Sequence, residues 1–162
     1  ELIAACTKCR HAKEIQVILA GRGPLEKKYR RLAEKLPNPI VMSFYEPARL
    51  LEILHMADLY VHTSDAEIEA MSCMEAFACG LVPVIADSPR SATPQFALDE
   101  RSLFPAGDTD VLAERIDWWL EHPEERREME LRYAEHAKQY TLEHSIQQTE
   151  EMFRMAIREQ RG

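Results

Sequence analysis

The chain has 162 residues, 46% hydrophobic and 30% charged, which is the size and composition of one folded domain. Its net charge of −8 argues against a nucleic-acid partner, because binding to phosphates requires a basic surface, and it gives no electrostatic attraction to anionic lipids. No segment approaches the roughly 20 apolar residues of a membrane-spanning helix, and the N-terminus shows no secretory signal pattern.

The first segment, residues 1–13, has apolar side chains at helical spacing and contains Cys6 and Cys9. This single C-x-x-C has no second pair to complete a zinc site, so we interpret both cysteines as small core residues. The chain has four cysteines without a patterned spacing, which is typical of proteins of the reducing cytoplasm.

Short apolar strands and amphipathic helices then alternate along the chain. The expected strands are 15–21, 40–44, 58–63 and 81–86, and the expected helices between them are 24–36, 47–57 and 70–79. Pro24 and Pro47 stand where a first helical turn accepts proline, and Gly80 is placed as a C-terminal cap. This order, with its short connections, predicts the α/β class, with a Rossmann-like parallel sheet and helices on both faces.

The second half of the chain is mainly helical. The expected elements are a short helix at 91–98, a short strand and loop at 101–107, and helices at 108–122, 123–140 and 141–162. The last three helices close the fold, and residues 1–162 are taken as a single domain. Trp118 and Trp119 suggest carbohydrate stacking, but their helical setting favours a place in the core with partial exposure.

Ligands of open α/β sheets bind outside the carboxyl ends of the strands. Four loops of this chain meet that condition: 21–24, 44–47, 62–71 and 86–93. In the first loop, Gly21 and Gly23 allow close backbone approach beside a helix N-terminus that favours anions, although a tight turn explains them equally well. A full G-x-G-x-x-G and a P-loop are absent, which disfavours a dinucleotide-dependent oxidoreductase.

The third loop leads into a helix flanked by two glutamates. Glu67 precedes the helix and Glu75 lies within it, with seven residues between them. The amides of the first turn, Ala70 to Cys73, have no partner inside the helix and are free to bind phosphate. Two carboxylates beside such amides suit a nucleotide sugar, which has hydroxyls at both ends and a diphosphate between them. An acidic turn that only complements the helix dipole is the alternative, and spacing alone does not decide.

Residues 67–86, "EIEAMSCMEAFACGLVPVIA", resemble the E-x7-E signature of the retaining GT-B glycosyltransferases of family GT4. Three further segments are similar to the same family in the same order: "VILAGRGPLEKKYRRLAEKL", "LLEILHMADLYVHTS" and "GDTDVLAERIDWWLEHPEERREM". A narrower resemblance, carried by "LYVH", "IDWWLE" and the run from "EIEAMSC" to "DERSLF", is to a bacterial lipid-glycosylating branch. That branch includes cholesterol α-glucosyltransferase and diacylglycerol glycosyltransferases.

The resemblance implies two Rossmann-like domains that face each other across a cleft, and this chain corresponds to the C-terminal, donor-binding domain. The N-terminal acceptor domain would precede Glu1, together with the first strand of the donor domain and the basic residues that follow it. Arg22 and Arg90 are the nearest basic candidates for the donor diphosphate. At the matching positions, Glu75 would bind the ribose hydroxyls, and Glu67 would be the catalytic residue that faces the hexose.

Backbone and loop positions complete the implied donor site. They are Ala70, Met71 and Ser72 at the sugar and diphosphate, Gly21 and Gly23 at the nucleotide, and Phe44 and Tyr45 at the base. The sequence departs from the family at Ile68-Glu69-Ala70, where a Gly-Phe-Gly-like run is frequent. His62 ends the preceding strand, either as a structural histidine or as a contact to the donor or acceptor.

The implied reaction transfers a hexose from a nucleoside-diphosphate sugar, expected to be a UDP-sugar, to a hydroxyl acceptor with retention of configuration. A sterol or diacylglycerol is the implied acceptor, so the full-length cytoplasmic protein would contact a membrane peripherally. No cofactor and no metal are expected, and the 162 residues alone are expected to be inactive. Two alternatives stay open: a non-catalytic Rossmann-like nucleotide-binding domain, and a GT-B epimerase or phosphorylase-like domain.

Overall fold

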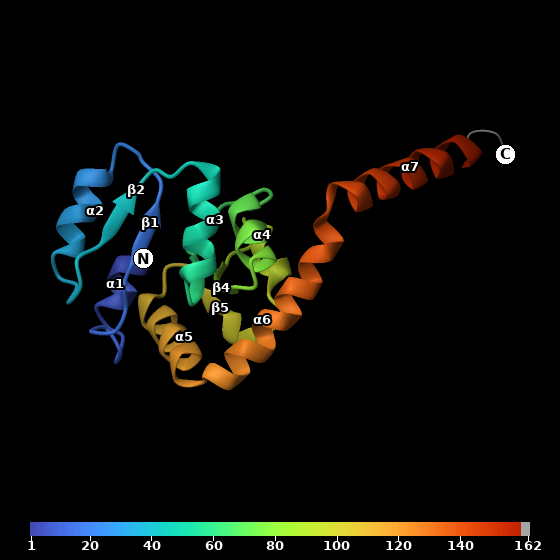
Figure 1. Ribbon diagram of the computed structural model, residues 1–162. Helices are drawn as coiled ribbons and strands as arrows, with labels where there is room; N and C mark the ends of the chain where they lie inside the picture. Colours follow the sequence, from blue (N-terminus) through green and yellow to red (C-terminus); the bar gives the residue numbers. More distant parts are fainter. Residues whose placement is uncertain (160–162) are drawn as a thin grey trace.

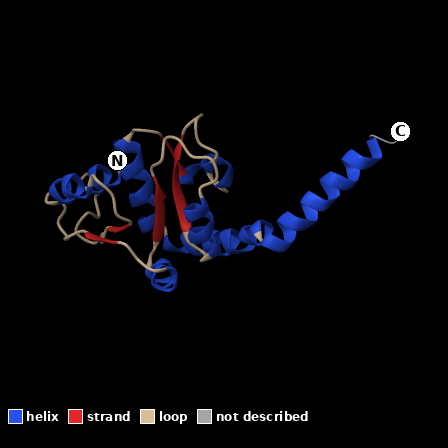
Figure 2. Cartoon of the chain, turned by 90° about the horizontal axis from the view of Figure 1, so that it is seen from above, coloured by secondary structure: helices blue, strands red, loops and turns tan. Residues whose placement is uncertain are grey.

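The computed structural model describes residues 1–159 as an α/β fold with helices on both sides of short strands (Figure 1, Figure 2). The strands are β1 (Ile18–Ala20), β2 (Val41–Ser43), β3 (Leu59–His62), β4 (Val82–Asp87) and β5 (Leu103–Pro105). The helices are α1 (Leu2–Cys6), α2 (Glu26–Ala33), α3 (Pro47–Met56), α4 (Met71–Ala78), α5 (Thr109–Glu121), α6 (Pro123–Ala137) and α7 (Leu142–Glu159). Short 3-10 turns are formed by Thr93–Phe96, Glu100–Ser102 and Lys138–Tyr140.

All strand pairs are parallel, but they form two separate sheets. β1 pairs with β2, and β4 pairs with β3 on one side and β5 on the other. The α/β class with parallel strands and helices on both faces is confirmed. The strands of residues 1–159 form two parallel sheets rather than the one expected, and no ladder joins them.

The core is centred on β4. Val82, Val84 and Ile85 are fully buried, because this strand has a partner on each side and helices on both faces. The largest fully buried side chains of the surrounding helices are Phe77, Trp119 and Tyr133. Cys6 and Cys9 belong to the same cluster, which confirms their interpretation as core residues.

The two tryptophans of α5 differ in exposure as expected. Trp119 is fully buried, and its indole N–H donates to the carbonyl of Arg101 at 3.2 Å. Trp118 is half-buried and stacks on the ring of His122, with 4.2 Å between centroids. The guanidinium of Arg101 lies 4.1 Å from the ring centroid of Trp118. Trp118 is therefore engaged by protein side chains rather than free to stack on a carbohydrate.

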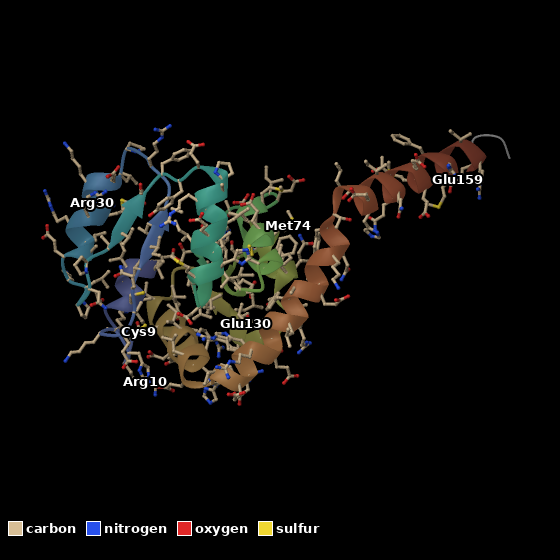
Figure 3. All side chains as sticks on the ribbon, in the orientation of Figure 1. Cys9, Arg10, Arg30, Met74, Glu130 and Glu159 are labelled. Atoms are coloured by element: carbon tan, nitrogen blue, oxygen red, sulfur yellow. The ribbon has the colours of Figure 1, made fainter. Side chains whose placement is uncertain are left out.

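The helix expected over residues 1–13 ends at Cys6, so its second half is a wrong prediction. The amides of Arg10 and His11 donate to the two carboxylate oxygens of Asp117 on α5, at 2.9 and 3.3 Å, instead of continuing a helical ladder. Asp117 is only 3% exposed. Figure 3 shows Cys9 and Arg10 beside α5. A buried carboxylate distant in sequence thus fixes the path of this segment.

We expect Asp117→Ala to lower the free energy of unfolding by about 2–4 kcal/mol, because two buried amides lose their acceptor. Urea denaturation at an unchanged m-value measures this loss. Asp117→Asn keeps one oxygen acceptor and should lose about half as much. Equal stability of Asp117→Ala and the wild type would show that the amides find other partners.

α7 extends away from the rest of the fold (Figure 1) and has no buried residue. Its exposed apolar side chains are Leu142, Ile146, Met152, Phe153, Met155 and Ile157. The helix expected over 141–162 is confirmed as far as Glu159, and its last three positions lie outside the described residues. Within residues 1–159, no helix combines the length and the apolar character that crossing a membrane requires.

Candidate functional site

The loop that carries Glu67 is fixed to the loop that follows β4. The amide of Glu67 donates to the carbonyl of Arg90 at 3.3 Å, and the amide of Ala92 donates to the carbonyl of Glu67 at 2.9 Å. The Ser88 hydroxyl donates to the Asp65 carboxylate at 2.8 Å, and Asp65 forms an ion pair with Arg90. Because β3 and β4 are parallel neighbours, both loops leave the same edge of the sheet. The backbone of Glu67 is therefore held in place at that edge.

The Glu67 carboxylate rests on the backbone turn that leads into α4. The amide of Ile68 donates to Glu67 Oε1 at 3.0 Å. The nearby backbone amides, first that of Ala70 and then those of Ile68 and Glu69, hold the pKa of Glu67 below its usual range, with a smaller contribution from His62. Consecutive amides around one anion form a concave site that a ligand oxygen could occupy as well. The turn before α4 therefore already binds a negative charge.

Ala70 holds the backbone conformation that glycine usually supplies. It has φ +50° and ψ 50°, in the left-handed region, and it is the one non-glycine residue with positive φ in the described part of the chain. It is 4% exposed. The run Ile68-Glu69-Ala70 therefore makes a left-handed turn without a glycine. An L-residue in this left-handed conformation is strained by about 1–2 kcal/mol.

This geometry predicts that two substitutions at Ala70 differ in their effect on the free energy of unfolding. Ala70→Val should lower the free energy of unfolding by about 2–4 kcal/mol, because a branched side chain adds both left-handed strain and overpacking. Ala70→Gly should change it by less than about 1 kcal/mol, because relief of strain offsets the lost methyl contact and the added entropy of the unfolded chain. Thermal and urea denaturation of the two variants test the pair. A stable Ala70→Val protein would contradict the left-handed conformation.

Three polar side chains connect β3 to the first turn of α4. The Tyr60 hydroxyl lies 2.9 Å from Ser72 Oγ and 3.1 Å from His62 Nδ1. His62 is buried, and its Nε2 has no hydrogen-bond partner among the described residues; it lies 4.0 Å from Glu67 Oε2. Burial lowers the pKa of His62 more than Glu67 raises it, so the imidazole is neutral at pH 7.

Glu75 and Met71 lie exposed on α4. Glu75 follows Ser72 by one helical turn, and no ion pair is formed by its carboxylate within the described residues. Ser72, Glu67 and the turn at Ala70 are thus brought together by the structure. Glu75 is one helical turn further along the same helix, with its carboxylate available to a ligand.

A second group of predicted residues gathers at the ends of β1 and β2. The amide of Gly21 donates to the carbonyl of Ser43 at 2.8 Å, and the Arg22 guanidinium lies 4.6 Å from the ring centroid of Phe44. A Cβ added at Gly21 or Gly23 would meet no atom within 4 Å, so these glycines leave open space rather than a packed contact. A pocket of about 360 Å³ adjoins them, lined by residues 19–26, Tyr29 and Met42.

The structure does not join the two groups directly. Within residues 1–159, no hydrogen bond or ion pair connects the loops after β1 and β2 with Glu67 or α4. Tyr45, in the second group, is half-buried and has no side-chain hydrogen bond among the described residues. Sequence reasoning missed Tyr60. Its position two residues before His62 on a strand, which places both side chains on one face, is the signal that could have found it.

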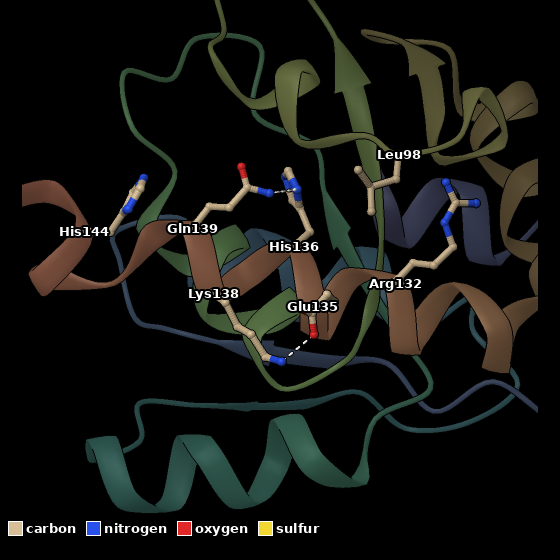
Figure 4. A pocket seen from close by; sticks show the side chains of 7 residues that line it. All are labelled: Leu98, Arg132, Glu135, His136, Lys138, Gln139 and His144. Atoms are coloured by element: carbon tan, nitrogen blue, oxygen red, sulfur yellow. Dashed lines mark hydrogen bonds and ion pairs between the residues drawn. The ribbon is translucent and has the colours of Figure 1, made fainter. Parts of the chain in front are cut away.

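Within residues 1–159, the acidic pair at the start of α5 and the pocket beside α6 contain none of the residues predicted for the donor site. The Asp-x-Asp at Asp108 and Asp110 is a helix cap, in which the Asp108 carboxylate accepts the amides of Asp110 and Val111. No group of three or more His, Cys, Asp or Glu within residues 1–159 is arranged to hold a metal. An open pocket of about 510 Å³ lies at the junction of α6 and α7 (Figure 4), and its walls contain none of the predicted donor-binding residues.

The family model described as "Glycosyl transferases group 1" matches residues 1–140. The chain belongs to this family. Among solved structures, the catalytic domain of cholesterol-alpha-glucosyltransferase from Helicobacter pylori is 48% identical, with a TM-score of 0.83 over 86% of this chain and 88% of that one. These findings confirm the resemblance to GT-B glycosyltransferases and to the lipid-glycosylating branch. A comparison with curated protein sequences gives no match.

More distant members of the fold extend the comparison. Alr3699/HepE from Anabaena, solved in complex with UDP, has a TM-score of 0.79 at 20% identity, over 95% of this chain and 44% of that one. The GtfA/B complex has a TM-score of 0.73 at 24% identity, over 88% of this chain and 30% of that one. Both likenesses establish the Rossmann-like half of the GT-B fold alone. The group 1 family membership identifies this chain as a glycosyltransferase domain.

Proposed function

We propose that the chain is the donor-binding domain of a retaining glycosyltransferase that takes a hexose from a nucleoside diphosphate, with UDP as the expected nucleotide. The observation that carries this proposal is the Glu67 carboxylate on the backbone turn that leads into α4, where the Ile68 amide donates to it. That turn has both components that a sugar diphosphate needs, amides for phosphate oxygens and an ionised carboxylate for sugar hydroxyls.

The proposed roles of the residues come from the family resemblance, and their places in the fold support them. Amides at Ala70, Met71 and Ser72 receive the phosphate and sugar oxygens, because the first amides of α4 have no helical acceptor. Glu67 orients the hexose, and Glu75, exposed one turn further along α4, accepts the ribose hydroxyls. Charge on the departing diphosphate is stabilised by the amides and the helix dipole. Arg90 lies at the same edge but is paired with Asp65.

The nucleotide would extend toward the ends of β1 and β2. Gly21 and Gly23 leave open space there, and Phe44, which is 54% exposed, provides an aromatic surface for the base. The acceptor is proposed to be a lipid hydroxyl, such as that of a sterol or diacylglycerol. Support comes from the 48% identity to a domain whose described activity is glucosyl transfer to cholesterol. Peripheral membrane contact and an N-terminal acceptor domain belong to the same proposal.

Calorimetry of the full-length protein against UDP-glucose, UDP-galactose and GDP-mannose tests the donor, and product analysis with sterol and diacylglycerol tests the acceptor. We expect binding of a UDP-sugar without added metal, and an α-linked glycolipid as product. The 162-residue chain alone should give no turnover. Nucleotide binding without transfer would favour a non-catalytic domain, and free sugar phosphate or an epimerised donor would favour the phosphorylase-like or epimerase alternative.

A further inference from the structure

A chain of polar side chains runs from the exposed Ser72, in the first turn of α4, through the buried His62 to Glu67. Ser72 Oγ lies 2.9 Å from the Tyr60 hydroxyl, which lies 3.1 Å from His62 Nδ1. The other ring nitrogen, Nε2, is buried without a partner among the described residues and lies 4.0 Å from Glu67 Oε2. Because His62 is only 8% exposed, a lone polar atom there is costly unless another state of the site provides its partner.

Electrostatics sets the direction of the hydrogen bonds in this chain. A bare Nε2 lone pair facing an ionised carboxylate would be repelled, whereas an Nε2–H is attracted. With the proton on Nε2, Nδ1 must accept, and Tyr60 is its donor. Burial raises the pKa of Tyr60 to about 12, so the phenol keeps its one proton for this bond. The Tyr60 oxygen is then left to accept from the Ser72 hydroxyl.

Donor binding changes what the Glu67 carboxylate can contact. Without ligand, it accepts the amide of Ile68 at 3.0 Å, and the neighbouring amides of Glu69 and Ala70 also stabilise its charge. A hexose oxygen that takes the Ala70 amide removes part of this stabilisation. His62 Nε2 has no partner among the described residues, and its distance of 4.0 Å from Glu67 Oε2 is too long for a hydrogen bond. A shift of about 1 Å in the carboxylate would bring the two atoms within bonding distance.

We propose that His62 is a positioning residue of the donor site: when a nucleotide sugar binds, Nε2–H closes onto Glu67 and aims the carboxylate at the hexose hydroxyls. Tyr60 and Ser72 act behind it by fixing the imidazole tautomer. This inference rests on the proposed function of the site. The contact between His62 and Glu67 depends on the hexose, because the nucleotide alone does not displace the Glu67 carboxylate from the backbone amides beside it.

Two substitutions of His62 distinguish the contributions of its two ring nitrogens to donor binding. His62→Gln places an amide donor near the Nε2 position, whereas His62→Asn reaches only the Nδ1 position. Calorimetry of the full-length protein compares UDP with UDP-glucose, with His55→Asn on the exposed side of α3 as the control. We expect UDP affinity within about twofold of the wild type in every variant. UDP-glucose affinity should fall about tenfold in His62→Asn and less than about threefold in His62→Gln, the size of one hydrogen bond.

Equal losses in the two His62 variants, or a tenfold loss for UDP itself, would show a purely structural histidine and overturn the proposal. Wild-type UDP-glucose affinity in His62→Asn would overturn it as well. Should neither His62 variant fold, Tyr60→Phe decides, since it removes one oxygen from the chain: a selective loss for UDP-glucose supports the proposal and an unchanged affinity overturns it. A wild type that binds no nucleotide would instead refute the proposed function, and this inference with it.

Discussion

Glu67→Gln in the full-length protein should reduce the turnover number for hexose transfer by about 10²–10³-fold, the size of the loss when one preorganised polar contact to the reacting centre is removed. Glutamine keeps the shape of the side chain but not its charge. It therefore accepts the hexose hydroxyls more weakly and holds the amides of Ile68 and Ala70 less firmly. Because the ribose and base contacts are elsewhere in the proposed site, UDP affinity should stay close to that of the wild type.

Steady-state kinetics with the best donor, and calorimetry with UDP, measure the two parts of this prediction. Glu69→Gln is the matched control, since Glu69 is an exposed glutamate two residues away in the same loop. Loss of the charge also weakens the hydrogen bond from the Ile68 amide, and denaturation separates the resulting fall in stability from the kinetic effect. Near wild-type turnover in Glu67→Gln would remove Glu67 from the catalytic role.

The alternation of strands and helices could be predicted because it depends on local patterns. β4 is a continuous apolar run in the sequence and a fully buried central strand in the structure. Gly80 has φ +85° at the end of α4, as its placement as a cap requires. These features are set by neighbouring residues, so one sequence suffices to find them.

The features that sequence reasoning missed depend on contacts between distant residues. The end of α1 at Cys6 is set by Asp117, more than 100 positions later, which takes the amides that would continue the helix. The split into two sheets depends on which strands pair, and periodicity carries no information on pairing. The two glutamates were found from their spacing together with the family resemblance, and His62 and Ser72 were named at the same edge. Tyr60, which connects His62 to Ser72, was missed because the three side chains come together only when β3 packs against α4.

Glu75→Gln should weaken UDP binding about 10–100-fold, because a hydrogen bond to a charged group is worth about 1.5–3 kcal/mol and each 1.4 kcal/mol is a factor of ten in affinity. The loss should be the same for UDP and UDP-glucose, since the ribose is common to both. Stability should not change, because Glu75 is exposed and forms no ion pair within residues 1–159.

The two carboxylates are therefore distinguishable by ligand rather than by total activity. Glu67 and its support from His62 should affect only ligands that carry a hexose, whereas Glu75 should affect every ligand that carries the ribose. Calorimetry with UDP, UDP-glucose and the base uracil alone separates these contributions, with the exposed Glu114 of α5 giving the control Glu114→Gln. If Glu75→Gln weakened UDP-glucose but not UDP, Glu75 would belong to the sugar end, and the order of the donor along α4 would be the reverse of the one proposed.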